Sequence, residues 1–431
     1  MWNCECRTEG MNLGRRRLCT RLNYGVMGDS TASTYFRKGF GLKAEVQTVL
    51  DSDYDGRLVD LLRERDYTLS AGGVTVKLAR EFGFCYGVER AVEYAYQTRR
   101  KFPDRRIYLA GEIIHNPHVN RKLLEMGIVF LEAGADGFDY AGVRPEDVVI
   151  LPAFGVTIGD FEKLRNLGCV MVDTTCGSVL NVWKRVESYA RDGFTSLIHG
   201  KYYHEETRAT ASQALKYPGA HYIVVRTMEE AGLVCDFIEG RAPREAVLDL
   251  LAHAASPCFD PALHLERVGV ANQTTMLARE SLAVGETVGQ AMARAHGDAY
   301  RAANFRTFDT ICSATQDRQD AVAALLADPL DVMLVVGGFN SSNTISLAAL
   351  CAERVPTYHV EDAEGIDPEN GTVHYRPVGI HHHEADAAGW LPANGAVTVG
   401  ITAGASTPNN KIAEAVSRVF RTRGVDPATI A

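Results

Sequence analysis

The feature that most constrains this fold is an alternation of short runs rich in β-branched residues with stretches of helical periodicity. Each run is long enough for one strand, and most runs are followed by a helical pattern, which is the signature of βαβ units and parallel sheets. The predicted strands lie at 73–79, 105–114, 146–154, 169–175, 194–200, 221–226, 267–273, 331–338, 356–360 and 396–404. In such sheets the loops after the strands carry the chemistry, so we expect an α/β fold with its functional residues there.

The first 36 residues do not share this alternation. Acidic residues at Glu5, Glu9 and Asp29 count against an organelle-targeting segment, which is normally poor in acidic residues. We therefore expect an irregular N-terminal tail, either disordered or wrongly included in the chain. Residues 44–66 then carry a helical pattern before the first predicted strand.

Length, charge and cysteine usage exclude several classes of protein. A chain of 431 residues allows about three domains. The net charge of −9 leaves no basic surplus to neutralise phosphates, so nucleic acid is not the expected partner. No apolar run approaches the roughly 18 residues of a membrane span, and no signal peptide opens the chain. The ten cysteines include no CxxC pair, which argues against a secreted disulfide framework and for a reducing cytosol.

A sequence pattern that recurs along the chain, called here the internal echo, distinguishes three of these cysteines from the rest. The stretches DTTCGSV, at Cys176, and DTICSAT, at Cys312, share Asp-Thr-x-Cys before a helical pattern, and FGFCYGV places Cys85 similarly without the Asp-Thr. A single cysteine at such a position is most often a small core residue. Three in the same context, 91 and 136 residues apart, instead indicate a shared function.

Three widely spaced thiolates limit the kinds of site that these cysteines can form. Nucleophilic catalysis needs one cysteine with a base, and a structural zinc site normally needs four ligands, usually in close-spaced pairs. Three thiolates that converge from separate domains suit a cubane iron–sulfur cluster with one iron left without a protein ligand. The other cysteines lack this context and are interpreted as packing or tail residues: Cys4, Cys6, Cys19, Cys169, Cys235, Cys258 and Cys351.

The loops around the triad are rich in polar residues. Glycine-rich loops with hydroxyls at predicted helix starts, together with histidines at strand ends, suggest an anion site built from N–H dipoles and hydroxyls. The polar set comprises His115, His118, His199, His204, Glu205, Glu206, Thr274, Thr275, Ser341, Ser342, Asn343 and Ser406. No Walker A motif and no GxGxxG after a strand support ATP or a nicotinamide. The histidine run in 379–386 is interpreted as a solvated loop.

At these residues the sequence resembles the LytB family, the hydroxymethylbutenyl diphosphate reductases that end the non-mevalonate isoprenoid pathway. The resemblance runs from about residue 37 to the end of the chain. It is carried by RKGFG, FGFCYGVERAV, EIIHNPHVN, VVILPAFGV, VDTTC, IHGKYYHEET, ANQTTML, TICSATQDRQDA, VVGGFNSSNT and TAGASTP. LPAFG and the longer stretch around 236–268 resemble the plant and cyanobacterial branch.

The resemblance implies roles for individual residues. Cys85, Cys176 and Cys312 would hold a 4Fe–4S cluster. Glu206 would relay protons to the departing hydroxyl, with Thr274 beside it. The residues around the substrate, several of them on its diphosphate, would be His115, His204, Thr274, Ser341, Ser342, Asn343 and Ser406. We expect the histidines to act as cations toward the diphosphate and Glu205 to be a solvated carboxylate.

The resemblance also implies a fold of three similar α/β lobes, with small and mostly parallel sheets around a central iron–sulfur cluster. The expected parts are an irregular tail at 1–36, a helical extension at 37–73, a first lobe at 74–172 to which 405–431 returns, a second lobe at 173–306 with an insertion near 236–268, and a third lobe at 307–404.

The expected activity is reduction of (E)-4-hydroxy-3-methylbut-2-enyl diphosphate to isopentenyl and dimethylallyl diphosphate, with electrons from a ferredoxin- or flavodoxin-like protein. A non-redox iron–sulfur hydro-lyase and an iron–sulfur sensor are the alternatives. The expected compartment is the bacterial cytoplasm, or the plastid stroma if the tail is a transit segment. Two residues depart from the family pattern: Phe154 replaces the histidine of many bacterial members, and Gly177 replaces a proline.

Overall fold

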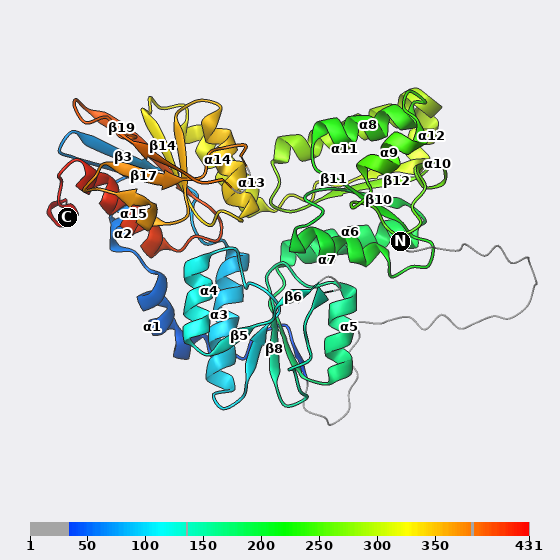
Figure 1. Cartoon of the computed structure of the whole chain (residues 1–431), viewed down its shortest axis with the longest axis horizontal. Coiled ribbons are helices and arrows are strands. Elements are labelled where there is room, and N and C mark those ends of the chain that lie inside the picture. Colours follow the sequence, from blue (N-terminus) through cyan, green and yellow to red (C-terminus); the bar gives the residue numbers. More distant parts are fainter. Residues whose placement is uncertain (1–33, 135–136, 381–382, 431) are drawn as a thin grey trace, which may run out of the picture. The chain divides into compact units, whose positions relative to one another are not determined.

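The structure is a computed structural model that describes residues 34–134, 137–380 and 383–430 (Figure 1). The α/β prediction is confirmed, because the main sheets are small and mostly parallel. The role expected for the tail falls on residues 1–33, outside the described residues. Residues 35 and 36, which were expected to be irregular, form a short strand at the edge of the first sheet instead.

The first sheet is parallel throughout and has the strand order β1-β9-β8-β4-β5. Strand β8 is buried along its whole length, as expected for a parallel strand covered on both faces. The strands are β1 (Tyr35–Phe36), β4 (Ile107–Leu109), β5 (Ile128–Phe130), β8 (Val148–Leu151) and β9 (Val170–Asp173). The helices that belong to this part are α1 (Lys43–Tyr54), α3 (Tyr86–Lys101), α4 (Pro117–Glu125) and α5 (Ile158–Leu167).

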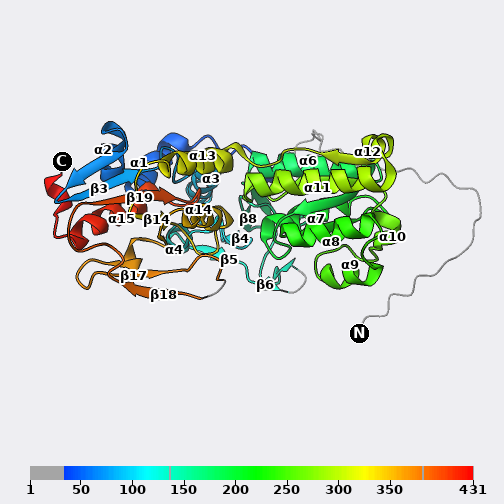
Figure 2. The ribbon, with the colours of Figure 1, turned by 90° about the horizontal axis from the view of Figure 1, so that it is seen from above.

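The second sheet is also parallel and has the order β11-β10-β12-β13. Helices α8 and α11 cover one face, and α6 and α7 lie on the other (Figures 1 and 2). Its strands are β10 (Thr195–His199), β11 (Tyr222–Val225), β12 (Val268–Asn272) and β13 (Phe305–Thr307). Its helices are α6 (Gly177–Arg191), α7 (Glu205–Ala214), α8 (Met228–Ile238), α9 (Arg244–Leu250), α10 (Pro261–His264), α11 (Ala278–His296) and α12 (Asp298–Asn304).

The third sheet has the order β15-β14-β19-β3-β2, and only the β2–β3 pair is antiparallel. Its strands are β2 (Thr68–Ala71), β3 (Val74–Leu78), β14 (Val332–Val336), β15 (Thr357–Val360) and β19 (Val397–Ala403). Its helices are α2 (Arg57–Glu64), α13 (Ser313–Leu325), α14 (Ser342–Ala352) and α15 (Asn409–Thr422). Smaller pieces are the hairpin β6 (Ala133–Gly134) with β7 (Gly137–Phe138), and the antiparallel β16 (Ile366–Asp367), β17 (Thr372–Tyr375) and β18 (Ala385–Ala388).

The third sheet differs from the expectation for the chain ends. Strand β3 pairs with β19, so residues 74–78 lie in the same sheet as the 307–404 segment and not beside β4. Helix α15 packs into the same core, with Val416 and Phe420 buried next to Val76. The pairing is non-local, which is why residue patterning alone did not place this strand.

The same arrangement of strands and loops recurs in all three sheets. In each, a cysteine lies between a strand and a helix, and its backbone N–H donates to a carbonyl in the loop after the neighbouring strand. The three bonds are Cys85 to Ala405 (3.1 Å), Cys176 to Ala153 (3.0 Å) and Cys312 to Thr274 (3.4 Å). The internal echo in the sequence therefore corresponds to a repeated structural unit.

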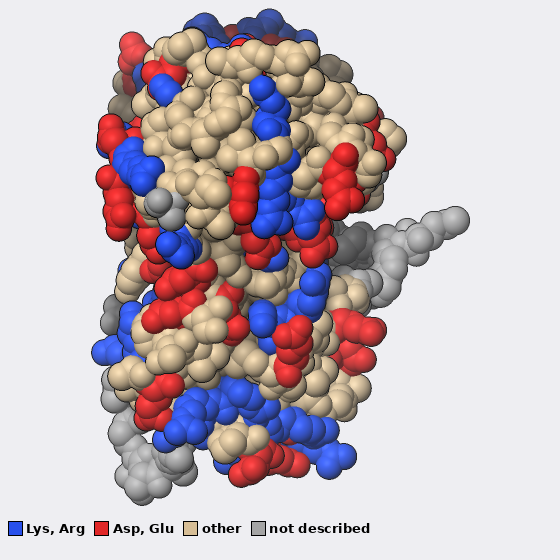
Figure 3. Space-filling model, turned by 90° about the vertical axis from the view of Figure 1, so that its left-hand side faces the viewer, with Lys and Arg blue, Asp and Glu red and all other residues tan. Residues whose placement is uncertain are grey.

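No helix in the described ranges is long and apolar enough to cross a membrane. The face drawn in Figure 3 carries both basic and acidic side chains among uncharged ones, with one group of basic side chains near its lower end. The net charge of −9 is thus not concentrated into one acidic surface on this face.

Candidate active site

One cavity, with about 670 Å³ of atom-free space, brings the predicted site residues together. They come from all three sheets, from the loops that follow the strands, as expected for parallel α/β sheets. The predicted residues that line it are Cys85, Cys176, Cys312, His115, His204, Glu206, Thr274, Ser341, Ser342, Asn343 and Ser406. Thr275 of the polar set also lines it, and three other members do not. His118 packs against Tyr54, His199 binds Ser281 in the core, and Glu205 pairs with His115 outside this lining.

The thiol end of the cavity is formed by Cys85, Cys176 and Cys312, each the residue that precedes the first turn of a helix. All three are free thiols. Burial raises the pKa of the Cys85 thiol, and it raises the pKa of the Cys312 thiol to about 11. Thiolates in such a site need a cationic partner, and a bound metal lowers the pKa of a coordinating thiol far below its free value.

Gly87 lies beside two of the three thiols. A Cβ at this glycine would lie 2.6 Å from Cys176 Sγ and 3.9 Å from Cys85 Sγ. The helix therefore leaves space beside the sulfur atoms that any larger residue would occupy. Three free thiols around an apolar space, with room kept open by a glycine, fit a metal–sulfur group held by three thiolates.

A second group of residues surrounds the first turn of α7. The imidazole of His204 caps this helix, and its Nδ1 accepts the N–H of Glu206 at 3.1 Å. The neutral ring therefore carries its proton on Nε2. Glu206 Oε1 accepts the backbone N–H of Thr274 at 2.6 Å. Burial raises the pKa of Glu206 to about 7, although the hydrogen bonds from Thr274 oppose the shift. Glu206 is thus a carboxyl group that can carry a proton near neutral pH.

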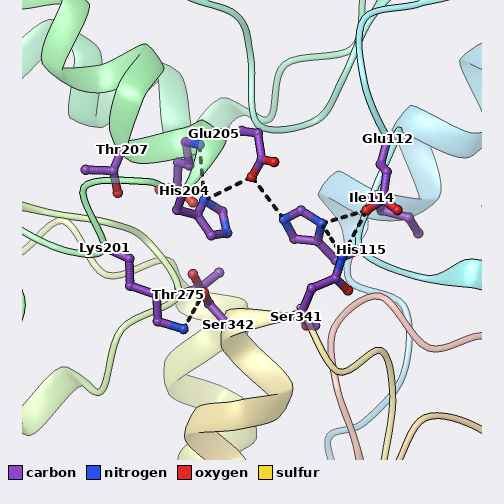
Figure 4. Close-up of polar contacts among 12 residues, drawn as sticks. Glu112, Ile114, His115, Lys201, His204, Glu205, Thr207, Thr275, Ser341 and Ser342 are labelled. Carbon is purple, nitrogen blue, oxygen red and sulfur yellow. Dashed lines mark hydrogen bonds and ion pairs between the residues drawn. The ribbon is translucent and has the colours of Figure 1, made fainter. Parts of the chain in front are cut away.

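His115, in the lining of the cavity, lies between two carboxylates that are outside the lining (Figure 4). Its Nδ1 is 2.9 Å from Glu112 Oε2, and its Nε2 is 3.5 Å from Glu205 Oε2. Burial alone would lower the pKa of His115, but the two carboxylates prevail and raise it to about 9. Phe154 stacks on the ring, with centroids 4.3 Å apart and planes at 21°.

These contacts correct two expectations. The first is that both histidines are cations: burial and the charge of His115 hold the pKa of His204 far below its usual range. The second is that Glu205 is a solvated carboxylate. It is half exposed, but it pairs with His115, and this ion pair keeps its pKa low despite partial burial.

The hydroxyl end of the cavity is built on the start of α14. Ser341 caps the helix, and Ser342 and Asn343 occupy its first turn, where backbone N–H groups have no partner within the helix. Asn343 Oδ1 accepts the N–H of Ala405 at 2.9 Å, and Ser406 Oγ donates to His115 O at 3.0 Å. Asn343 Nδ2 is buried and has no hydrogen-bond partner among the described residues. Such a set of donors suits an anion.

Sequence reasoning missed a supporting layer behind this end. Lys201 and Gln273 do not line the cavity, yet both donate to Ser342 Oγ. Both follow strands of the second sheet, in the loops that were already singled out, so their position next to predicted residues was the available signal. The contact itself joins segments about 140 residues apart, which no local pattern predicts.

With the geometry described, the chain can be compared with known proteins. The model of the LytB protein family matches residues 76–420. The chain belongs to this family. Its relatives include the 4-hydroxy-3-methylbut-2-enyl diphosphate reductase of Gloeobacter violaceus, which is 47% identical over 403 residues and is matched over 91% of this chain and 94% of the relative. The enzyme of the same name from Thermosynechococcus vestitus is 44% identical, over 92% of this chain and 96% of the relative.

The LytB fold is also seen among solved structures. The E-1-hydroxy-2-methyl-but-2-enyl-4-diphosphate reductase from Plasmodium falciparum superimposes with a TM-score of 0.58 at 21% identity, covering 80% of this chain and 87% of that one. The two departures noted in the sequence have structural counterparts. Phe154 stacks on His115. Gly177 is the first residue of α6, where a Cβ would have no atom within 4 Å beyond its chain neighbours and the backbone of its own helix.

Proposed function

We propose that this chain is a LytB-type reductase that converts (E)-4-hydroxy-3-methylbut-2-enyl diphosphate to isopentenyl and dimethylallyl diphosphate. The observation that carries the proposal is a single cavity with free thiols at one end and helix N-terminal hydroxyls and amides at the other. A substrate with a diphosphate at one end and a reducible allylic alcohol at the other matches this arrangement, because the donors suit the diphosphate and the thiols suit the group that reduces the alcohol. The relatives matched along almost their whole length carry the name of this activity.

The proposed cofactor is a 4Fe–4S cluster held by Cys85, Cys176 and Cys312. When bound, such a cluster supplies electrons and a Lewis-acidic iron without a protein ligand. The fit rests on the free thiols, on their placement at the cavity wall and on the space that Gly87 leaves beside the sulfurs. The remaining cysteines that the structure describes, Cys169, Cys235, Cys258 and Cys351, do not line this cavity.

The hydroxyl end would bind and orient the diphosphate. Ser341, Ser342 and Asn343 present side-chain and first-turn N–H donors, and Ser406 lies beside them. His204, at the start of α7, adds a neutral N–H donor. Each charge-assisted hydrogen bond to a phosphate oxygen stabilises the bound state by roughly 1.5–3 kcal/mol, so a few of them suffice for tight binding.

Glu206 would deliver the proton that the departing hydroxyl needs. The overall reaction consumes two electrons and two protons and releases water, so a proton donor must lie inside the cavity. Glu206 is buried there, and Thr274 holds one of its oxygens at 2.6 Å. A positioned general acid contributes about 10²- to 10⁴-fold to rate.

The electron donor is proposed to be a ferredoxin- or flavodoxin-like protein. The sequence carries no dinucleotide fingerprint, so NADPH alone should not support turnover. A cluster with an open iron is sensitive to oxidants, which fits a reducing compartment such as the bacterial cytoplasm or the plastid stroma. Robust turnover by the purified protein with NADPH as sole reductant would contradict this part of the proposal.

Anaerobic purification followed by iron and sulfide counting tests the proposal directly. We expect about four irons and four sulfides per chain, and turnover of the allylic diphosphate only when a chemical reductant is supplied. A hydro-lyase would act without reductant, and a sensor would bind the cluster without consuming the substrate. Either result would replace the proposed function.

A further inference from the structure

Lys201 is a cation with an unusual environment. It lies in the loop between β10 and α7, half buried, and its Nζ is 3.2 Å from Ser342 Oγ (Figure 4). No ion pair joins it to a carboxylate of the described ranges, and the charged neighbour that acts on it is another cation, Arg226. A partly buried charge without a counter-ion is costly. The amino group is therefore placed where an arriving anion would stabilise it.

Gln273 has an orientation that its neighbours determine. Its Oε1 faces the backbone N–H of Lys201 at 3.1 Å and the hydroxyl of Thr207 at 3.1 Å. A backbone N–H can only donate, so this amide atom must be the oxygen. The other amide atom, Nε2, then donates to Ser342 Oγ at 3.1 Å and to Thr275 Oγ1 at 2.9 Å.

A count of hydrogen bonds at Ser342 gives the direction of its hydroxyl. A serine oxygen has two lone pairs and one hydrogen. Lys201 Nζ and Gln273 Nε2 have no lone pair to offer, so both must donate, and the two lone pairs of Ser342 Oγ are used. The hydroxyl hydrogen can only be donated elsewhere. Because Ser342 lines the cavity, that hydrogen is available to a ligand bound there.

Lys201 can also supply positive charge, which the lining of the cavity lacks. None of the described residues that line it is lysine or arginine. The protonated His115 is already shared between Glu112 and Glu205, and His204 is neutral. A diphosphate would therefore meet many donors but little net positive charge from the walls themselves. Lys201, which has no ion pair among the described residues, lies one hydrogen bond behind Ser342.

We propose that Lys201 and Gln273 are positioning residues, which orient the Ser342 hydroxyl as a donor to a phosphate oxygen, and that Lys201 transmits positive charge to that oxygen through Ser342. The inference rests on the proposed function for the identity of the anion. Both residues would therefore affect the affinity for the anion through Ser342, although neither residue touches the anion.

Binding of inorganic diphosphate to the full, anaerobically purified chain, measured by calorimetry, tests the inference. Lys201→Met, which keeps the length and removes the charge, should weaken binding about ten-fold, and Lys201→Arg should restore it to within about three-fold of wild type. Lys216→Met, at an ion-paired lysine after α7, is the matched control and should bind like wild type. Unchanged affinity in Lys201→Met would overturn the proposal.

A double-variant cycle separates positioning from a merely structural role. In a Ser342→Ala background, Lys201→Met should cause almost no further loss, because its effect passes through the missing hydroxyl. An undiminished ten-fold loss in that background would overturn the proposed route through Ser342. In turnover assays Lys201→Met should raise KM and leave kcat within about two-fold.

The outcomes also separate this inference from the proposed function. A wild-type protein that binds diphosphate but does not reduce the allylic substrate would refute the function, while the binding comparison would still decide the role of Lys201. A wild-type protein without measurable affinity for diphosphate would refute the inference itself.

Discussion

The two ends of the cavity are built in opposite ways. At the hydroxyl end, Ser342, Asn343 and Ser406 are already held by hydrogen bonds from neighbouring loops. At the thiol end, one backbone hydrogen bond positions each cysteine, and of the three sulfurs only that of Cys312 forms a hydrogen bond with another side chain of the described residues, that of Thr315. A Cβ at Gly87 would fill the space beside the other two sulfurs. The anion end is thus preorganised, whereas the thiol end is completed by what it binds.

This difference has a consequence for substitutions. A preorganised end loses one interaction at a time, so single changes should weaken binding by graded amounts. An end that depends on a shared metal group loses the group as a whole, because metal binding and local structure are coupled.

Replacing any one of Cys85, Cys176 or Cys312 by serine should deplete iron and abolish turnover, because a hydroxyl is a poor ligand for iron in such a cluster. Cys169→Ser and Cys351→Ser are the controls, since both side chains lie in the core away from the cavity. Iron analysis and activity measure the effect. An iron-replete triad variant beside an iron-poor Cys351→Ser protein would reverse the ligand assignment.

Gly87→Ala should lower the iron content severalfold, because the new Cβ would lie 2.6 Å from Cys176 Sγ. The matched control is Gly177→Ala, where the added carbon would have no atom within 4 Å beyond its chain neighbours and the backbone of its own helix. Iron per chain after reconstitution is the readout. Equal iron in the two variants would mean that the space beside the sulfurs is not required.

Glu206→Gln should retain the iron and bind diphosphate, yet lose about 10²- to 10⁴-fold in kcat, because an amide cannot deliver the proton. Its raised pKa, near 7, means that the wild-type carboxyl is protonated below that pH, so kcat should fall as the pH rises above about 7. The residual activity of the variant should not show this fall of kcat with rising pH.

Glu280→Gln is the control for that prediction, because Glu280 lies in the first turn of α11, away from the cavity. Normal turnover by Glu206→Gln would remove the proposed proton path. Glu205 is unsuitable as a control, because it forms an ion pair with His115, which lines the cavity.

Asn343→Ala should weaken binding of diphosphate by about ten- to a hundred-fold and leave the iron content unchanged, since it removes one amide donor toward the anion. Asn304→Ala, at the end of α12, is the control. Calorimetric titration measures both. Wild-type affinity in Asn343→Ala would move the diphosphate away from α14.

Gly177→Pro should have the smallest effect, a gain of about 0.4–1 kcal/mol in unfolding free energy with activity retained. Proline is favoured at the first position of a helix and restricts the unfolded chain. Gly177 is that position in α6, and its surroundings are open. Denaturant unfolding of the wild type and of Gly177→Pro measures the difference in unfolding free energy. A lower value for the variant would show that this turn needs the conformational freedom of glycine.

The sequence by itself determined the elements and the local chemistry. Strand–helix alternation depends on residues close together in the chain, so each predicted strand from 73–79 to 396–404 corresponds to an observed one. The Asp-Thr-x-Cys echo and the serine-rich helix starts are local for the same reason. What patterning missed were the short pieces, such as β1 and the small antiparallel strands, which carry too few residues to show a period.

The tertiary structure decided everything that depends on distant partners. Strand β3 joined the third sheet through β19, more than 300 residues later. The neutral state of His204 and the ion pair of Glu205 follow from burial and from His115, which lies about 90 residues away in the chain. Lys201 reached Ser342 from another sheet. Protonation and hydroxyl direction are properties of a packed environment, and that environment exists only once the chain has folded.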